Sequence, residues 1–209
     1  MTPTTAKNLD DFVIRKARPD EAETVIEMLE LTSRTLLENN IIQWPVGMFT
    51  SPEGRQQIHD GTAAGRYFMV DYRSCTSCSV SEEPAGQGAE IAGLFLLNDE
   101  DPFDALLWKG FAEDWLDALY LHRLLVKEPF QGCGLTGKVM AFAEDRVRQM
   151  GRHFLRLDCL AGNLPLRRFY KEKCRGKGKG GMNELTTVWN PELELEFARY
   201  ELRVAAEGA

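Results

Sequence analysis

A glycine-rich segment in the second half of the chain has the composition of an anion-binding loop. It reads Gln131-Gly132-Cys133-Gly134-Leu135-Thr136-Gly137-Lys138 and lies between a predicted strand and a predicted helix. Main-chain N–H groups at the start of a helix, together with the helix dipole, favour an anion such as phosphate, and glycines let the phosphate approach the backbone closely. A glycine-rich turn that binds nothing is the alternative that this composition leaves open.

The same segment partly fits the phosphate loop of nucleotide hydrolases. It has the spacing G-x-x-x-x-G-K, but Val139 stands where Ser or Thr would bind Mg²⁺. Residues 154–158 are mostly apolar and end in an acid, as in the second motif of these enzymes, but Arg156 interrupts them. Residues 127–130 also separate the loop from its strand, whereas such a loop normally leaves its strand directly. Nucleotide binding is therefore the weaker of two phosphate-binding interpretations.

The cysteines and histidines do not have the spacing of a metal site. The five cysteines are odd in number, and the first residues lack the apolar segment of a secretion signal, so reduced thiols are expected. Cys75 and Cys78 form a single C-x-x-C, and the three histidines are scattered along the chain. Cys133 precedes a predicted helix, a position that can lower the pKa of a thiol. We expect no bound metal and no disulfide.

Strands and helices alternate in the first half of the chain. A strand over 12–15 leads into a helix that begins near Pro19 and carries apolar residues at helical spacing from Ala22 to Leu29. Two strands, 67–70 and 91–96, are predicted to pair antiparallel. The Ser-, Gly- and Pro-rich connection over 74–89 is predicted to be flexible.

The glycine-rich segment lies inside a predicted βαβ unit. Strands over 119–126 and 154–160 flank a helix whose apolar residues recur from Leu135 to Met150 and which stops at Gly151. A second helix begins at Pro165, a flexible low-complexity stretch covers 176–183, and strands over 186–189 and 195–202 close the fold. The predicted class is mixed α+β: one domain over 1–209, with a mostly antiparallel sheet, flanking helices and one βαβ crossover.

Residues 124–136 resemble the acyl-CoA loop of the GNAT superfamily of N-acetyltransferases, whose signature is R/Q-x-x-G-x-G/A after an apolar strand. Gln131 and Gly134 match, whereas Thr136 replaces the small residue at the last position, although Gly137 follows. The resemblance continues with Asn163 at the end of the next strand and Tyr170 on the following helix. The usual Gly-Phe beyond that helix is replaced by Cys174-Arg175. The likeness covers roughly residues 12–203, and its specific part is 119–174.

The resemblance implies direct transfer of an acetyl group from acetyl-CoA to a primary amine of a small molecule or peptide, within a ternary complex. It implies that main-chain groups of the strand hold the pantetheine arm and polarise the thioester, and that the loop binds the pyrophosphate. The implied cofactor-binding residues are Leu124, Leu125, Val126, Gln131, Gly132, Cys133, Gly134, Leu135, Thr136, Gly137, Lys138, Asn163 and Tyr170. A covalent acetyl-enzyme on Cys133 is the less favoured mechanism.

The chemistry also needs an acid and a base. Tyr170 resembles the family's general acid, which protonates the sulfur of coenzyme A, and a phenol with an ordinary pKa near 10 is protonated at neutral pH. The alternative is that Tyr170 is a core residue beside Phe169. His122, with an ordinary pKa near 6.5, could be the base or position a water molecule, although a single strand histidine is more often structural.

Strand alternation predicts that His122 shares a face with Tyr120, Leu124 and Val126. The competing bases are three acids just before this strand, for which the alternative is a solvated loop. They are Glu113, Asp114 and Asp117.

Charge is distributed unevenly along the chain. The 209 residues carry a net charge of −7, yet residues 121–180 hold 14 Lys and Arg against 5 Asp and Glu. The resemblance implies that seven basic side chains form a positive rim for the phosphates of coenzyme A, and the alternative is a solvated helix face and tail. These side chains are at 167, 168, 171, 173, 175, 177 and 179. A role in nucleic-acid binding is the weakest interpretation, because the remainder of the chain carries −16.

The acidic remainder favours a cationic amine. The resemblance implies that variable elements set the substrate, here the N-terminal helices and the loops around Gln43-Trp44 and Leu107-Trp108, whose aromatic side chains could equally belong to the core. We expect a cytoplasmic monomer or homodimer that binds neither membranes nor nucleic acid. A non-catalytic acyl-CoA sensor is the second class of function that the sequence leaves open.

Overall fold

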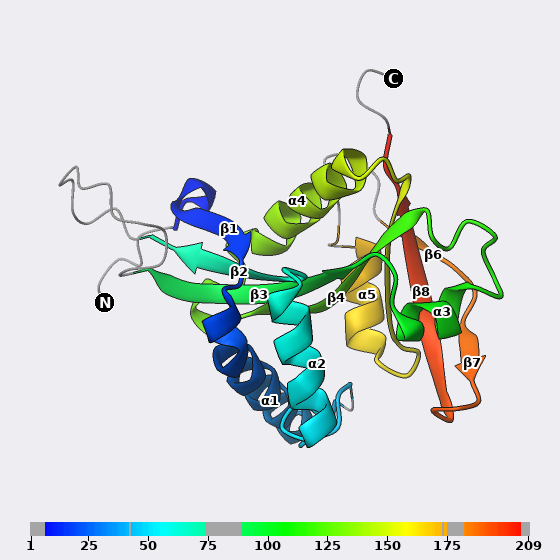
Figure 1. Ribbon diagram of the computed structural model, residues 1–209, viewed down its shortest axis with the longest axis horizontal. Helices are drawn as coiled ribbons and strands as arrows, with labels where there is room; N and C mark the ends of the chain where they lie inside the picture. The colour runs from blue at the N-terminus through cyan, green and yellow to red at the C-terminus, as the bar shows by residue number, and fades with distance from the viewer. Residues whose placement is uncertain (1–6, 42, 74–88, 173, 175–181, 206–209) are drawn as a thin grey trace.

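The computed structural model describes residues 7–41, 43–73, 89–172, 174 and 182–205. One twisted sheet runs through the molecule in the order β1-β2-β3-β4-β5-β8-β6, with β7 paired to β8 (Figure 1). The strands are β1 Phe12–Lys16, β2 Tyr67–Tyr72, β3 Glu90–Asn98, β4 Ala118–Val126, β5 Phe154–Leu160, β6 Asn183–Glu184, β7 Val188–Asn190 and β8 Leu195–Arg203. Among the described strands only β4 and β5 pair in parallel, so the predicted mixed, mostly antiparallel class is confirmed.

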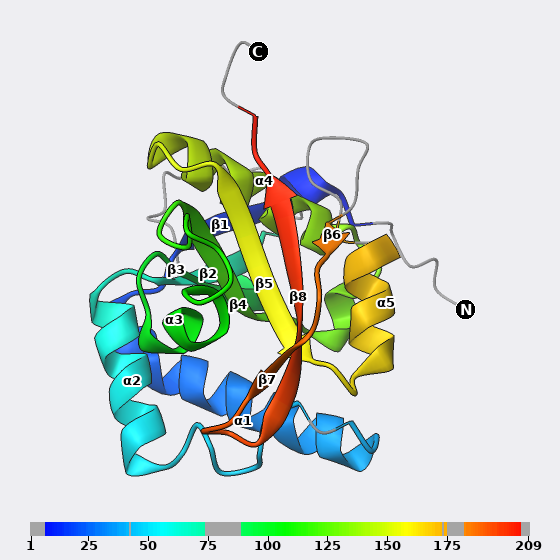
Figure 2. The ribbon, with the colours of Figure 1, turned by 90° about the vertical axis from the view of Figure 1, so that its right-hand side faces the viewer.

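Helices cover both faces of this sheet. They are α1 Ala22–Glu38, α2 Pro52–Ala63, α3 Pro102–Trp108, α4 Leu135–Gln149 and α5 Leu164–Glu172. Helices α1 and α2 lie on the face opposite α4 in both views of the ribbon (Figure 1 and Figure 2). The core beneath α1 and α2 includes Val25, Ile26 and Leu29, and the core beneath α4 includes Val139 and Val147. No helix in the described ranges is both long and apolar enough to cross a bilayer.

Two helices were not predicted from the sequence, although both carry start signals. In α2, Ser51 accepts a hydrogen bond from the main-chain N–H of Gly54 and Pro52 occupies the first turn. In α3, Asp101 accepts from the N–H of Phe103 and Pro102 follows it. The apolar periodicity of α2 is weak because its buried face consists of Ile58 and two small residues. Residues 74–88 and 176–181 of the two segments predicted to be flexible lie outside the described residues, whereas Asn183 begins the short strand β6, which the sequence did not predict.

A β-bulge interrupts β4 at Arg123, which has a positive φ of 53°. Leu125 pairs with Leu94 and His122 with Leu96, so three steps along β4 match two along β3. The extra residue reverses the alternation of side chains. Leu124 and Val126 therefore pack in the core beneath α4, and His122 points to the other face. The prediction that these three residues share a face was wrong.

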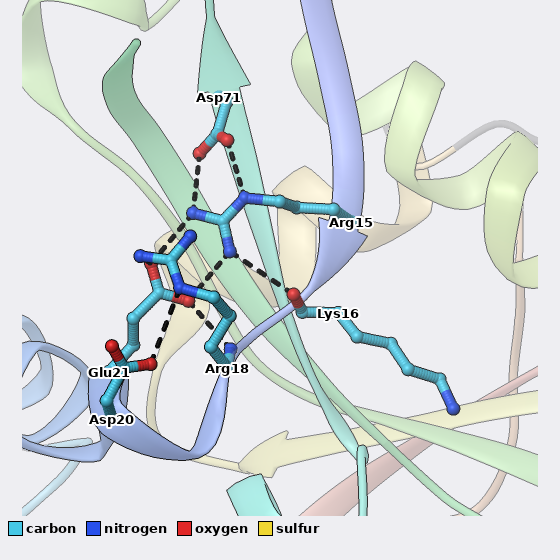
Figure 3. Close-up of polar contacts among 6 residues, drawn as sticks. All are labelled: Arg15, Lys16, Arg18, Asp20, Glu21 and Asp71. Atoms are coloured by element: carbon cyan, nitrogen blue, oxygen red, sulfur yellow. Dashed lines mark hydrogen bonds and ion pairs between the residues drawn. The ribbon is translucent and has the colours of Figure 1, made fainter. Parts of the chain in front are cut away.

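Arg15 on β1 ties the first strand to the turn that begins α1 (Figure 3). Its Nε donates to Asp71 on β2 at 2.6 Å, and its two terminal nitrogens donate to Glu21 at 2.7 and 2.8 Å. Asp71 and Glu21 are 1% and 6% exposed, and Glu21 also pairs with Arg18 at 2.9 Å. The charge of Asp71 therefore depends most on the guanidinium of Arg15. Burial alone would raise the pKa of Glu21, but hydrogen bonds from Arg15 and from the N–H of Arg18 lower it below its usual value.

We expect Arg15→Met to lower the free energy of unfolding by about 3 kcal/mol, because it removes the ion-pair partner of the buried Asp71 carboxylate and leaves Glu21 with Arg18 alone. Urea denaturation at neutral pH measures this loss. The matched control is Arg34→Met, since Arg34 is 63% exposed and pairs with Glu30 within one helix; its expected cost is below about 1 kcal/mol. Equal effects of the two substitutions would contradict the role assigned to Arg15.

Candidate active site

Strands β4 and β5 separate next to the glycine-rich loop. They are paired only where Ala118, Leu119 and Tyr120 face Phe154, Leu155 and Arg156 among the described residues. Beyond that point β4 stays paired with β3 as far as Val126, and β5 stays paired with β8 as far as Leu160. The facing edges of β4 and β5 are therefore unpaired near their carboxyl ends. An elongated ligand could hydrogen-bond to these main-chain groups.

The loop at the end of β4 presents main-chain donors. Gly132 and Gly134 have φ of 77° and 80°, and Gly134 is the N-cap of α4. No acceptor within the described residues binds the N–H groups of residues 134–137. A Cβ at Gly132 or at Gly137 would meet no atom within 4 Å, and the first turn of α4 has no acidic residue. These features fit a pyrophosphate at the N-terminus of α4.

Several of the predicted loop residues have side chains that contact the protein itself. Leu135 is buried in the core, and Cys133 packs partly against it. The Nζ of Lys138 donates to the carbonyl of Leu9 at 2.6 Å, and Gln131 donates to the carbonyl of Val126 at 3.2 Å. The side chain of Gln131 therefore links the loop to the last residue of β4.

Asn163 and Tyr170 lie on the other side of the opening. The side-chain oxygen of Asn163 accepts from the N–H of Leu166 at 3.2 Å at the start of α5, and its Nδ2 donates to Gln43 at 2.9 Å. This contact brings the loop after α1 to the end of β5. Tyr170 is 9% exposed, its ring centroid lies 5.3 Å from that of Tyr200, and its hydroxyl has no hydrogen-bond partner within the described ranges. Burial raises the pKa of Tyr170 well above 10.

His122 lies between two carboxylates on the opposite face of the sheet. Its Nε2 is 2.7 Å from Asp104 on α3, and its Nδ1 is 3.8 Å from Asp158 on β5. Burial alone would lower the pKa of His122, but the charges of Asp104 and Asp158 raise it to about 9. Burial raises the pKa of Asp158 to about 6, against the opposing effect of His122. An imidazole in this position is protonated at neutral pH, which argues against its predicted role as a base.

The sequence pattern does not identify Asp104 or Asp158 as candidate site residues. Asp158 is visible only as the acid that ends an apolar strand, and Asp104 lies in a helix that was not predicted. Together with His122 they offer ligand atoms within 4.8 Å of one another, an arrangement that a metal ion could also use. Because both imidazole nitrogens face a carboxylate, the geometry is that of an ion pair, and the absence of a metal stays a prediction.

Two of the three competing acids are engaged elsewhere. Asp114 pairs with Arg156 at 2.8 Å, and Asp117 pairs with His153 at 2.8 Å. Like Glu113, they precede β4 and so lie at the end of that strand opposite to the glycine-rich loop. Their position argues against a role in the same reaction.

The predicted positive rim is only partly available for binding. Arg167 pairs with Glu184 at 2.6 Å and Lys171 with the same carboxylate at 3.5 Å. Four other members of the cluster, at 173, 175, 177 and 179, and the Cys75–Cys78 motif lie outside the described residues.

Comparison with known proteins identifies the family. Residues 44–176 match the Acetyltransferase (GNAT) family. The chain is 29% identical over 165 residues to the uncharacterized N-acetyltransferase YesJ of Bacillus subtilis (strain 168), covering 78% of this chain and 80% of that protein.

Solved structures share the fold. A GNAT-family acetyltransferase from Listeria monocytogenes 4b F2365 superposes with a TM-score of 0.65 at 22% identity, covering 92% of this chain and 94% of that one. RimL, a ribosomal L7/L12 α-N-protein acetyltransferase in complex with coenzyme A, gives 0.59 at 13% identity and covers 97% and 99%. The structure of yncA from Salmonella typhimurium with acetyl-CoA gives 0.56 at 13% identity and covers 95% and 96%. With its family match over more than half of the sequence, the chain belongs to the GNAT family of acetyltransferases.

Proposed function

We propose that this enzyme transfers an acetyl group from acetyl-CoA directly to a primary amine of a small molecule or peptide, within a ternary complex, in the opening between β4 and β5. The observation that carries the proposal is the position of this opening. The unpaired edges of the two strands lie beside the free N–H groups at the start of α4. An elongated acyl donor with a pyrophosphate at one end and a thioester at the other matches both features.

The loop and β4 would hold the donor through main-chain groups. The N–H groups of residues 134–137 and the space over Gly132 suit the pyrophosphate, and the edge of β4 over 124–126 suits the amide-containing pantetheine arm. Acetyl-CoA supplies an activated acyl group. Gln131 links the loop to the end of β4, and Asn163 links the turn after β5 to Gln43. These two side chains would hold the two sides of the opening in position.

Tyr170 is proposed as the general acid. Its raised pKa keeps the phenol protonated throughout the neutral range. It would donate its proton to the sulfur as the C–S bond breaks and regain one from the amine nitrogen once the C–N bond has formed. We place His122 in the same site as a positioning group, on the opposite face of the sheet from Tyr170. An acid on the face of Tyr170 and a base on the face of His122 would suit a departing thiolate and an attacking amine on opposite sides of one carbonyl carbon.

The substrate is proposed to be a cationic amine, on the basis of the acidic remainder of the chain and the carboxylates around His122. We also propose that the enzyme works in the cytoplasm as a monomer or homodimer. RimL, which has the same fold, acts on the α-amine of a ribosomal protein, and a protein or peptide N-terminus is therefore included among the amines to be tested.

The test is release of coenzyme A thiol, with four amines that differ in charge: butylamine, 1,4-diaminobutane, β-alanine and a short peptide with a free α-amine. We expect release with at least one of them, a mass-spectrometric signal for the acetylated amine, and a salt-sensitive KM for the dication. Intersecting lines in two-substrate kinetics are expected for a ternary complex. Parallel lines would contradict direct transfer, and binding of acetyl-CoA without release on any amine would contradict the proposed catalysis.

A further inference from the structure

The group formed by Asp104, His122 and Asp158 has an asymmetry that the family resemblance does not predict. Asp104 is fully buried and one of its oxygens contacts His122 at 2.7 Å, which is a short, direct hydrogen bond. Asp158 is 6% exposed at its side chain, and its nearer oxygen lies 3.8 Å from the same ring, beyond hydrogen-bond distance. The imidazole is therefore hydrogen-bonded to Asp104, whereas Asp158 interacts with it only through charge.

The Oδ2 atoms of Asp158 and Asp104 are both buried and have no hydrogen-bond partner within the described residues. A buried carboxylate oxygen without a donor is costly, because burial removes the water that would otherwise solvate it. Asp158 also lies on β5 beyond its last pairing with β4, at the opening where the donor is proposed to bind. An ammonium or amine that enters this opening would supply the missing donor.

His122 cannot readily take the proton itself. To act as a base it must be neutral, and the two carboxylates raise its pKa to about 9, so that at pH 7 roughly one molecule in 100 carries a neutral ring. The carboxylate of Asp158, with a pKa of about 6, is mostly ionised at the same pH and can still bind a proton. A pKa just below the working pH suits a general base.

We propose that Asp158 accepts a proton from the attacking amine, and that Asp104 and His122 form a charged pair that positions its carboxylate. The inference rests on the proposed function and names the base that this function needs. The substrate ammonium loses two protons in all. Asp158 takes the first and releases it to water; the second leaves after the C–N bond has formed and replaces the proton that Tyr170 gives to the departing thiolate.

Other charged or titratable groups face Asp158 from the neighbouring elements. Asp104 and His122 face it from α3 and β4, and the charge of Asp158 also acts on Tyr170 of α5. Arg199 is its partner in register on β8, but that guanidinium donates to the carbonyls of Leu107 and Thr186. The strongest stabilisation of the ionised carboxylate therefore comes from His122.

The first test compares the pH dependence of kcat/KM for three proteins, with the amine of the four that gives the fastest thiol release. The wild type is expected to lose activity as the pH falls through about 6, where Asp158 becomes protonated. Asp158→Asn should lower kcat/KM by about 100-fold or more. It should also abolish the fall in activity at acidic pH, which is the acidic limb of the profile. His122→Gln should keep the limb but move it to higher pH, because it removes the cation that lowers the pKa of Asp158. Loss of the limb in His122→Gln and its retention in Asp158→Asn would overturn the proposal.

A second measurement needs no substrate and no variant of Asp158 or His122. The ¹⁵N chemical shifts of the three histidine rings, followed with pH in the wild type, report the charge of each imidazole. The signals are assigned with His59→Gln and His153→Gln, which are also matched controls because each removes a histidine from an exposed ion pair. A protonated His122 at pH 7 supports the proposal, and a neutral one overturns it. If the wild type acetylates no amine, the proposed function fails, and the titration still decides the charge of His122.

Discussion

Replacement of Gly137 by aspartate is expected to weaken acetyl-CoA binding by about 100-fold without unfolding the protein. A carboxylate about 5 Å from a phosphate charge costs about 3 kcal/mol at the effective dielectric constant of a protein surface, which corresponds to roughly two factors of ten in Kd. The fold should tolerate the change, because a Cβ at Gly137 meets no atom within 4 Å. An acid in the first turn of a helix is itself stabilising by about 0.3–1 kcal/mol. Calorimetric titration and thermal unfolding measure the two effects.

The matched control is Gly110→Asp, which adds the same charge where a Cβ again meets no atom within 4 Å. This residue follows α3 and lies before β4, away from the start of α4. The affinity of the Gly110→Asp variant for acetyl-CoA should stay within about a factor of two of that of the wild type, because salt screens an exposed charge that lies farther than about 10 Å from the phosphates. An equal loss in both variants would mean that overall charge, rather than the amides of the loop, controls binding.

Tyr170→Phe is expected to lower kcat by about 100-fold while leaving the affinity for acetyl-CoA nearly unchanged. Removing a general acid typically costs between about 100- and 10,000-fold, and the ring itself stays in the core. Because burial raises the pKa of Tyr170 well above 10, the phenol does not titrate in the neutral range. The reduction in kcat should therefore be the same at every pH between about 6 and 9.

Tyr200→Phe is the matched control for this substitution. Tyr200 lies next to Tyr170, and its hydroxyl donates to Glu184 at 3.2 Å. Loss of that bond should cost about 1 kcal/mol of stability and change kcat by less than a few-fold. If Tyr170→Phe retained full turnover, Tyr170 would be a core residue, as the alternative interpretation of the sequence allows.

The strand and helix pattern was predictable where apolar periodicity is strong. The βαβ unit around the loop and the last strand, β8, follow the sequence closely, because each buries a regular apolar face. The short strand β7 was also predicted, although its Trp189 is exposed. Helices α2 and α3 depend instead on capping by Ser51 and Asp101 and on a short buried face, which periodicity does not detect.

The site was predictable only in its backbone parts. The glycines of the loop are visible in the sequence because few other residues adopt a positive φ. The bulge at Arg123 is not visible, since arginine seldom has a positive φ, and this single residue places Leu124 and Val126 on the opposite face from His122. The proximity of Asp104 and Asp158 depends on the packing of α3 against β4 and β5, which no local pattern encodes.

Calorimetric titration of the wild type with acetyl-CoA tests the central assignment most directly, with Mg²⁺-ATP titrated in parallel under the same conditions. We predict one saturable acetyl-CoA site per chain, weakened in Gly137→Asp and retained in Tyr170→Phe, and no saturable binding of Mg²⁺-ATP. Saturable binding of Mg²⁺-ATP without binding of acetyl-CoA would show that the loop serves a nucleotide, and would contradict the assignment of the opening between β4 and β5 to an acyl donor.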